Sequence, residues 1–293
     1  MQGFTTPVLI NAFGSSERMA AALGVERLDE LSARVAKLLD LRMPGSFFDK
    51  LRKLGDLFDV AKAGPKRVRS AACQEVVETD RPSLATLPII RCWPGDAGRY
   101  ITLPMVFTRD PVSGRAMSAC TACRSSTTRR SACTGRFTRA PPSIIASPKS
   151  RRSPWRWPSP SAATRARSTR ARRPCRPGID EMVFSGWLRG SGVPMVACKT
   201  VDLEVPAEAE IVLEGWVDPA ERRLEGPFGD HTGYYSLARD YPVFHLKAIT
   251  RRKSPIYPTT IVGRPPRKTT GSARPPSASS CPSFASSCPR SWT

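Results

Sequence analysis

Histidine is scarce in this sequence, because the 293 residues include 2 His against 25 Asp and Glu and 46 Lys and Arg. A His-rich metal site therefore has too few ligands. No apolar run reaches the length of a membrane span, and the start of the chain (Met1-Gln-Gly-Phe) lacks the charged and apolar regions of a secretion signal. Walker and dinucleotide fingerprints are also missing, as is a Ser/His/Asp order. The lack of a membrane span and of a secretion signal predicts a soluble cytoplasmic protein.

Acidic residues are absent from two segments of the chain. Residues 115–176 contain 16 Lys and Arg, and residues 264–293 contain 5, with no Asp or Glu in either segment. The remainder carries 25 basic and 25 acidic residues, so the net charge of +21 comes entirely from these two segments. A charge of this size is typical of nucleic-acid-binding proteins. Because the net charge is confined to these two segments, the sequence indicates instead a globular protein of balanced charge that is interrupted by two pieces of foreign composition.

The first of these pieces, residues 115–176, is called the basic interval here. It shows neither helical nor strand periodicity and has few apolar groups, which predicts a disordered arm. Its stretch 151–157 (Arg-Arg-Ser-Pro-Trp-Arg-Trp) could neutralise and stack on single-stranded nucleic acid. Cys120 and Cys123 have the spacing of a metal or redox pair, but a single CxxC is a weak signal. A nonenzymatic basic protein that binds RNA or DNA is therefore one hypothesis.

Outside these pieces the chain reads as mixed α and β. Ser15 and Ser16 can cap a helix that Gly24 separates from the next one. Apolar spacing predicts further helices over residues 26–39, 47–63 and 180–189. Strands are expected at residues 87–90, 100–108, 201–205, 211–217, 241–250 and 256–262, with Pro104 at an edge or bulge and a polar connection over 218–223. Cys73 and Cys92 are expected to be reduced core thiols.

The segment 224–235, Leu-Glu-Gly-Pro-Phe-Gly-Asp-His-Thr-Gly-Tyr-Tyr, is called the acidic loop here. Its glycines permit unusual backbone angles and its proline restricts one, so the loop can hold Glu225 and Asp230 at set positions. General acid–base chemistry needs such placement. An ordinary turn with solvated carboxylates is the alternative. His231 is expected to support the loop by hydrogen bonding, and His245 to lie on a strand.

With Tyr-Pro-Val-Phe-His at 241–245, Pro-Ile-Tyr-Pro at 255–258 and Thr-Ile-Val-Gly-Arg-Pro at 260–265, the acidic loop closely resembles the UbiD family of decarboxylases. The resemblance extends over residues 91–114 and 177–266, and residues 7–62 are compatible with the family's N-terminal domain. It implies an N-terminal α/β domain (1–98), a split β-barrel cofactor domain (99–263) interrupted by the basic interval, and an aberrant tail (264–293). The family's C-terminal domain would be absent.

UbiD-like enzymes remove CO2 from aromatic or α,β-unsaturated acids with prenylated FMN and a divalent metal, usually Mn²⁺, with K⁺ as a further possibility. The resemblance implies that Asp230 protonates the substrate carbon from a raised pKa in an apolar pocket, and that Glu225 pairs with an arginine. Glu181 matches a metal ligand, although a Glu in a first helical turn is often a surface residue. A flavin prenyltransferase would supply the cofactor, and the family forms homo-oligomers.

We interpret the two foreign pieces as out-of-frame translation, because a shifted reading of their codons allows strings that the family has there. The arginine, the metal-binding Asn and His, and most of the flavin-phosphate cradle would then be lost with the basic interval. Glu225 would lack its charge partner and Glu181 its companion ligands. The resemblance therefore predicts a hydroxybenzoate-type decarboxylase that is impaired in this chain, and an inert gene remnant is a further alternative.

Overall fold

A computed structural model describes residues 3–31, 35, 62–109, 116–120, 123–125, 130–133, 155–161 and 181–263. All but two residues of the helix expected over 47–63, half of the one over 26–39 and the whole tail 264–293 lie outside these ranges. Helix α1 (Ser16–Leu23) confirms the predicted caps: the Ser15 side chain accepts a hydrogen bond from the Arg18 backbone, and Gly24 adopts a left-handed conformation with φ 68°. Among the described residues, no helix combines the length and apolar character that crossing a membrane requires.

The second described helix, α6 (Glu181–Arg189), confirms the helix expected after residue 180. Two 3-10 turns lie at Ala72–Gln74 and Leu84–Thr86. The strands are β1 (Val8–Ile10), β2 (Lys66–Val68), β3 (Val76–Glu78), β4 (Arg99–Ile101), β5 (Met105–Arg109), β6 (Ala116–Cys120), β7 (Cys123–Ser125), β8 (Arg130–Cys133), β9 (Trp155–Ser161), β10 (Pro194–Ala197), β11 (Glu204–Pro206), β12 (Ile211–Glu225), β13 (Arg239–Arg251) and β14 (Tyr257–Thr259).

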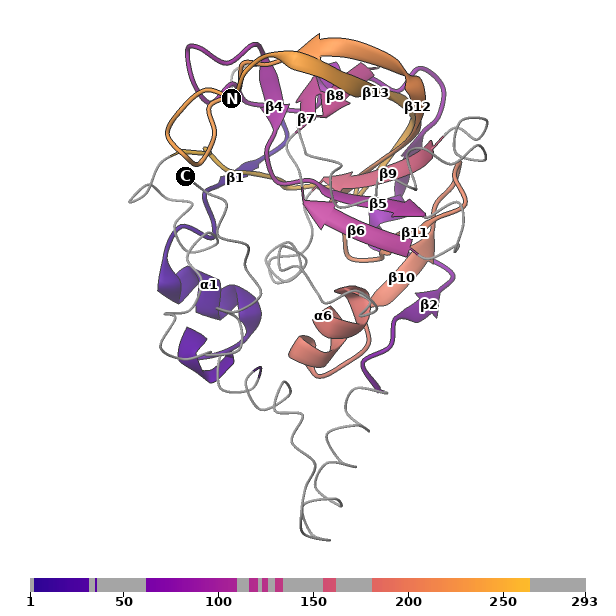
Figure 1. The fold of residues 1–293 in the computed structure, drawn as a ribbon. Coiled ribbons are helices and arrows are strands. Elements are labelled where there is room, and N and C mark those ends of the chain that lie inside the picture. The colour runs from indigo at the N-terminus through magenta and orange to yellow at the C-terminus, as the bar shows by residue number, and fades with distance from the viewer. Residues whose placement is uncertain are drawn as a thin grey trace, which may run out of the picture.

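The largest described sheet is organised around the antiparallel hairpin of β12 and β13. Its strand order is β4-β7-β8-β13-β12-β9, and β3 also pairs with β13. Figure 1 shows these two long strands curving over the upper part of the molecule, with β5, β6 and β9 below them. Strand β5 pairs with β6, and β10 pairs with β2 and β11 in a third, smaller sheet. The mixed α and β class predicted from the sequence is confirmed.

The basic interval is not simply a disordered arm, so that prediction is wrong for its described residues. They form β6, β7, β8 and β9. Strand β9 pairs with β12 from Trp155↔Val217 to Ser161↔Ile211, and β8 pairs with β13. Ladder hydrogen bonds are made by the backbone, so a segment can join a sheet without an alternating side-chain pattern.

Several strand boundaries also differ from the sequence expectations. The strand expected over 100–108 is divided into β4 and β5 around Pro104, because proline cannot donate to a ladder. Residues 87–90 contribute a single bridge, Ile90 to Tyr100, and residues 201–203 are not a strand. Strand β10 was not anticipated. The supposed polar connection over 218–223 is part of β12, after a register shift between Val217 and Arg222.

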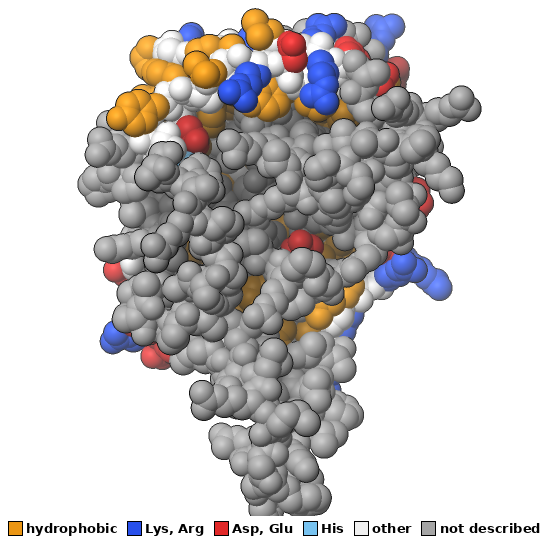
Figure 2. Space-filling model, in the orientation of Figure 1, with side chains coloured by type: hydrophobic (Ala, Val, Ile, Leu, Met, Phe, Trp, Pro, Cys, Tyr) orange, Lys and Arg blue, Asp and Glu red, His pale blue; other side chains and the backbone are white. Residues whose placement is uncertain are grey.

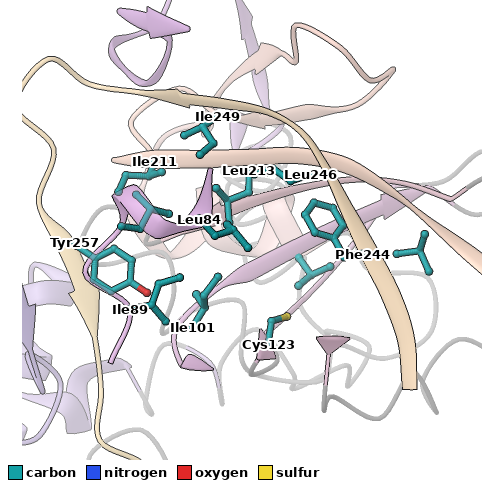
Figure 3. Close-up of a cluster of buried hydrophobic side chains, with 13 residues drawn as sticks. Leu84, Ile89, Ile101, Cys123, Ile211, Leu213, Phe244, Leu246, Ile249 and Tyr257 are labelled. Atoms are coloured by element: carbon teal, nitrogen blue, oxygen red, sulfur yellow. The ribbon is translucent and has the colours of Figure 1, made fainter. Parts of the chain in front are cut away.

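The main core lies beneath the β12–β13 hairpin, and Figure 3 shows how its side chains converge. The cluster consists of Leu84, Leu87, Ile89, Ile101, Val106, Cys123, Ile211, Leu213, Val217, Phe244, Leu246, Ile249 and Tyr257. A second cluster joins α6, β10 and β11 to β5 around Met105, Phe107 and Met195. Cys73 and Cys92 are free thiols, as expected, and Cys73 is buried. The first cluster includes Ile211, Leu213 and Val217 from the first half of β12.

Candidate active site

The acidic loop begins with the last two residues of β12, Leu224 and Glu225, and residues 236–238 join it to the first residue of β13, Arg239. Gly226 has φ +104°, a conformation that a side chain would strain, and the bond from Gly226 to Pro227 is cis. Farther along, Gly229 forms a bridge with Tyr235, so the loop folds back on itself. The glycines therefore act as predicted, at the points where the chain reverses.

Glu225 is completely buried and both of its carboxylate oxygens have a donor. The Tyr100 hydroxyl donates to Oε1 at 2.6 Å, and Arg124 Nη1 donates to Oε2 at 3.3 Å. Tyr100 and Arg124 lie directly opposite each other in the β4–β7 ladder, which places their side chains on one face of the sheet. Burial raises the pKa of Glu225, and the contacts with Tyr100 and Arg124 oppose that rise.

The pairing of Glu225 with Arg124 corrects one prediction from the sequence. We expected Glu225 to lack a charge partner because the basic interval was read as unrelated to the fold. Arg124 lies in that interval, yet strand β7 delivers it to the carboxylate, with its side chain 25% exposed. No local pattern around Arg124 indicates this contact, since it depends on the pairing of β7 with β4.

Asp230 lies at the exposed end of the same loop, with 38% of its side chain accessible. Its Oδ1 accepts from the backbone N–H of His231 at 2.7 Å and lies 2.6 Å from His231 Nδ1. This confirms that His231 supports the loop. The described residues do not enclose Asp230 in the apolar pocket that the resemblance implied. Glu225, and not Asp230, is the loop carboxylate that the fold removes from solvent.

The turn 92–97 holds the acidic loop in place through backbone and side-chain hydrogen bonds. Asp96 is buried; its Oδ1 accepts from the Gly229 N–H at 2.8 Å, and its Oδ2 accepts from the Cys92 and Trp93 N–H groups at 3.1 and 2.9 Å. The Ala97 N–H donates to the Pro227 carbonyl at 2.9 Å. Sequence reasoning missed Asp96, although an acid within a Trp-Pro-Gly-Asp turn is a common backbone acceptor.

The turn 92–97 and the acidic loop also approach each other closely at two glycines, Gly229 and Gly95. A Cβ atom on Gly229 would lie 2.4 Å from the Trp93 ring, and one on Gly95 would lie 2.6 Å from the Tyr235 ring. Trp93 is itself held, because its Nε1 donates to the Val262 carbonyl at 2.7 Å. The turn and the loop therefore meet with little space between them.

Glu181 lies in the first turn of α6 and is half-buried. Figure 1 shows α6 well below the β12–β13 hairpin. Within the part of the chain that the structure describes, no group of three His, Cys, Asp or Glu side chains gathers that could hold a metal. The described residues therefore do not fit a metal site at Glu181.

The acidic loop and its neighbours expose several large apolar side chains. Leu224, Tyr234 and Leu237 are 68, 76 and 74% exposed. Figure 2 shows hydrophobic side chains reaching the surface over the upper part of the molecule, beside Lys and Arg side chains. On the hairpin, His245 lies on β13 as predicted, stacks on Trp216 and bonds to Glu221.

The sequence from 66 to 265 matches a family described as UbiD, the 3-octaprenyl-4-hydroxybenzoate carboxy-lyase Rift-related domain. A relative from Archaeoglobus fulgidus is 41% identical over 276 residues, which are 90% of this chain and 54% of the relative. A relative from Aquifex aeolicus is 38% identical over 285 residues, 91% of this chain and 55% of the relative. The chain thus spans about half the length of the curated relatives that it matches.

Solved structures of the UbiD class share the fold. An evolved dimeric form of HmfF from Pelotomaculum thermopropionicum, in complex with prFMN, superposes with a TM-score of 0.75 at 28% identity, covering 89% of this chain and 57% of HmfF. Vanillic acid decarboxylase from Sedimentibacter hydroxybenzoicus gives a TM-score of 0.77 at 23% identity, covering 92% of this chain and 55% of that one. At that identity, the second likeness shows the fold alone.

Proposed function

The chain belongs to the UbiD family, and we propose from this premise that it derives from a carboxy-lyase that removes CO2 from a hydroxybenzoate-type aromatic acid with prenylated FMN. The observation that carries the proposal is the burial of Glu225, which is bonded to the Tyr100 hydroxyl, on the loop that also bears Asp230. The family's description as a hydroxybenzoate carboxy-lyase supports the class of substrate.

The HmfF structures hold prFMN or FMN. The region of this chain that matches the family, residues 66–265, contains the carboxylate loop with Glu225 and Asp230. The phosphate cradle that the resemblance implies falls within the basic interval, of which only residues 116–120, 123–125, 130–133 and 155–161 are described. When bound, the modified flavin supplies the electron sink for loss of CO2.

The chain's own residues supply placement and a proton. When the bond to the carboxylate breaks and CO2 leaves, the substrate carbon needs one proton, and we assign its delivery to the Asp230 carboxyl group. Glu225 is held by two donors and is the less hydrated acid, so it sets the charge beside the reacting centre. His231, at 2.6 Å from Asp230, orients that carboxyl group.

We also propose that this particular chain is impaired. Glu181 gathers no metal site among the described residues, so no step is assigned to Mn²⁺ or K⁺. The domains of the chain would be an N-terminal α/β part, a split-barrel part interrupted by the basic interval, and an aberrant tail from 264. We attribute the interruption and the tail to out-of-frame translation. A prenyltransferase supplying the flavin and assembly into a homo-oligomer belong to the same proposal.

The test compares this chain with one encoded by DNA corrected to a continuous family frame across the codons of Arg115 and Pro266. Both are supplied with prenylated FMN and Mn²⁺, and CO2 release is measured from a panel of hydroxybenzoic acids. We expect release from the corrected chain, loss of release in its Asp230→Asn variant, and none from the chain as it stands. A corrected chain without activity on any acid would overturn the proposed function. Activity in the uncorrected chain would overturn the proposed impairment.

A further inference from the structure

The Tyr100 hydroxyl lies between two acceptors. It is 2.6 Å from Glu225 Oε1 and 3.3 Å from the Pro227 carbonyl oxygen, and its ring is completely buried. The Phe228 ring lies against it at a centroid distance of 4.4 Å. A tyrosine hydroxyl carries one hydrogen and two lone pairs, so it can donate to one of these neighbours while it accepts from another.

The other side-chain partner of Glu225 among the described residues, Arg124, has no such freedom. Arg124 faces Oε2 and carries only donors, so it stabilises the ionised carboxylate and cannot accept a proton from the neutral acid. A proton that binds Glu225 therefore has a suitable acceptor on the Oε1 side, where Tyr100 lies. The Pro227 carbonyl already accepts from the Ala97 N–H at 2.9 Å and retains a second lone pair for Tyr100.

We propose that Tyr100 is a positioning residue that lets the buried Glu225 carboxyl group exist in both charge states. When Glu225 is ionised, Tyr100 donates to Oε1. When Glu225 takes up one proton on Oε1, that proton is shared with the Tyr100 oxygen, and the Tyr100 hydrogen turns to the Pro227 carbonyl. Tyr100 keeps its own proton throughout, so Glu225 gains one proton and no other group loses one.

The surroundings of the pair are consistent with this exchange. Burial and the nearby Glu225 carboxylate raise the pKa of Tyr100 well above its usual range, so the phenol stays protonated. Among the described residues, the other charged groups that act on the pKa of Tyr100 are Arg124, which lowers it, and Asp96, which raises it. The inference rests on the proposed function only where it gives Glu225 a role in decarboxylation.

The test measures the titration of the Glu225 carboxyl group by NMR on chain labelled at the glutamate side-chain carboxyl carbon. Glu225→Gln assigns the signal. In Tyr100→Phe we expect the midpoint to rise by about one pKa unit, because a hydrogen bond to an ionised acceptor contributes more than one to a neutral acid. Tyr257→Phe is the matched control, since its buried hydroxyl has no hydrogen-bond partner among the described residues. It should leave the midpoint unchanged.

A second measurement uses the unsubstituted chain and does not depend on whether the variant folds. The phenol carbon of Tyr100 should change its chemical shift with the same midpoint as Glu225, because its hydrogen bond reverses there. A Tyr100 signal that stays constant while Glu225 titrates would overturn the proposal, as would equal midpoints in the chain and in folded Tyr100→Phe. Neither measurement needs flavin or substrate, so an inactive chain tests this inference and leaves the proposed function to its own assay.

Discussion

Glu225 and Asp230 lie on one loop, but Glu225 is completely buried while 38% of the Asp230 side chain is exposed. Glu225 is bonded by residues from two other strands, whereas the side chain of Asp230 bonds, within the described part of the chain, to the adjacent His231. The difference teaches that proximity in sequence does not give two carboxylates one environment. What covers each end of the loop decides its chemistry.

The largest expected effect is a difference in the free energy of unfolding between variants at the two carboxylates of the loop. Glu225→Ala leaves the Tyr100 hydroxyl and the Arg124 guanidinium without their acceptor, and should lower the free energy of unfolding by about 3 kcal/mol. Asp230→Ala should lower it by less than about 1 kcal/mol, because its end is solvated. Urea unfolding of both variants provides the measurement. Equal losses would contradict the contrast.

The next effect concerns the residue that ties the exposed end to the fold. Asp96→Asn places an amide group against backbone N–H donors and should cost about 2 kcal/mol. The Gly229 amide should then exchange faster with solvent, because it loses the acceptor at 2.8 Å. Asp80→Asn, at an exposed position, is the control. Unchanged exchange at Gly229 in Asp96→Asn would show that Asp96 does not hold the loop.

Two glycine substitutions compare a contact with a fixed ring, that of Trp93, and a contact with a ring that can move, that of Tyr235. Gly229→Ala pushes a methyl group into Trp93, whose indole is bonded to Val262, and should cost about 1–3 kcal/mol. Gly95→Ala meets the Tyr235 ring, which is 48% exposed and can move, so its cost should stay below about 1 kcal/mol. Thermal unfolding compares the two variants, and the reverse order would be inconsistent with a clamped Trp93.

The smallest effect is a pH dependence that belongs to the buried end. The pKa of Glu225 is raised in the folded chain, so its contribution to stability is present below the ordinary value near 4.5 and is lost as pH rises through the raised pKa. As pH increases through this range, the free energy of unfolding of Glu225→Gln should therefore increase relative to that of the unsubstituted chain. Unfolding at a series of pH values measures the difference. A constant difference would mean that burial does not control Glu225.

Local features of the fold were predictable from the sequence. Ser15 and Gly24 set the ends of α1, and the glycines of the acidic loop mark the reversal between β12 and β13. The contacts of Arg124 were not predictable, because β7 is three residues long and lies in an interval without periodicity. A short strand finds its register through its partner, and here the partner is β4.

The sequence alone determined the carboxylate loop, its family and the identities of its two acids. Only the tertiary structure decided that Glu225 is the desolvated acid, that a residue of the basic interval neutralises it, and that Asp96 fastens the other end. The physical reason is that loop conformation depends on neighbouring residues, whereas desolvation and ion pairing depend on segments brought together from distant parts of the chain.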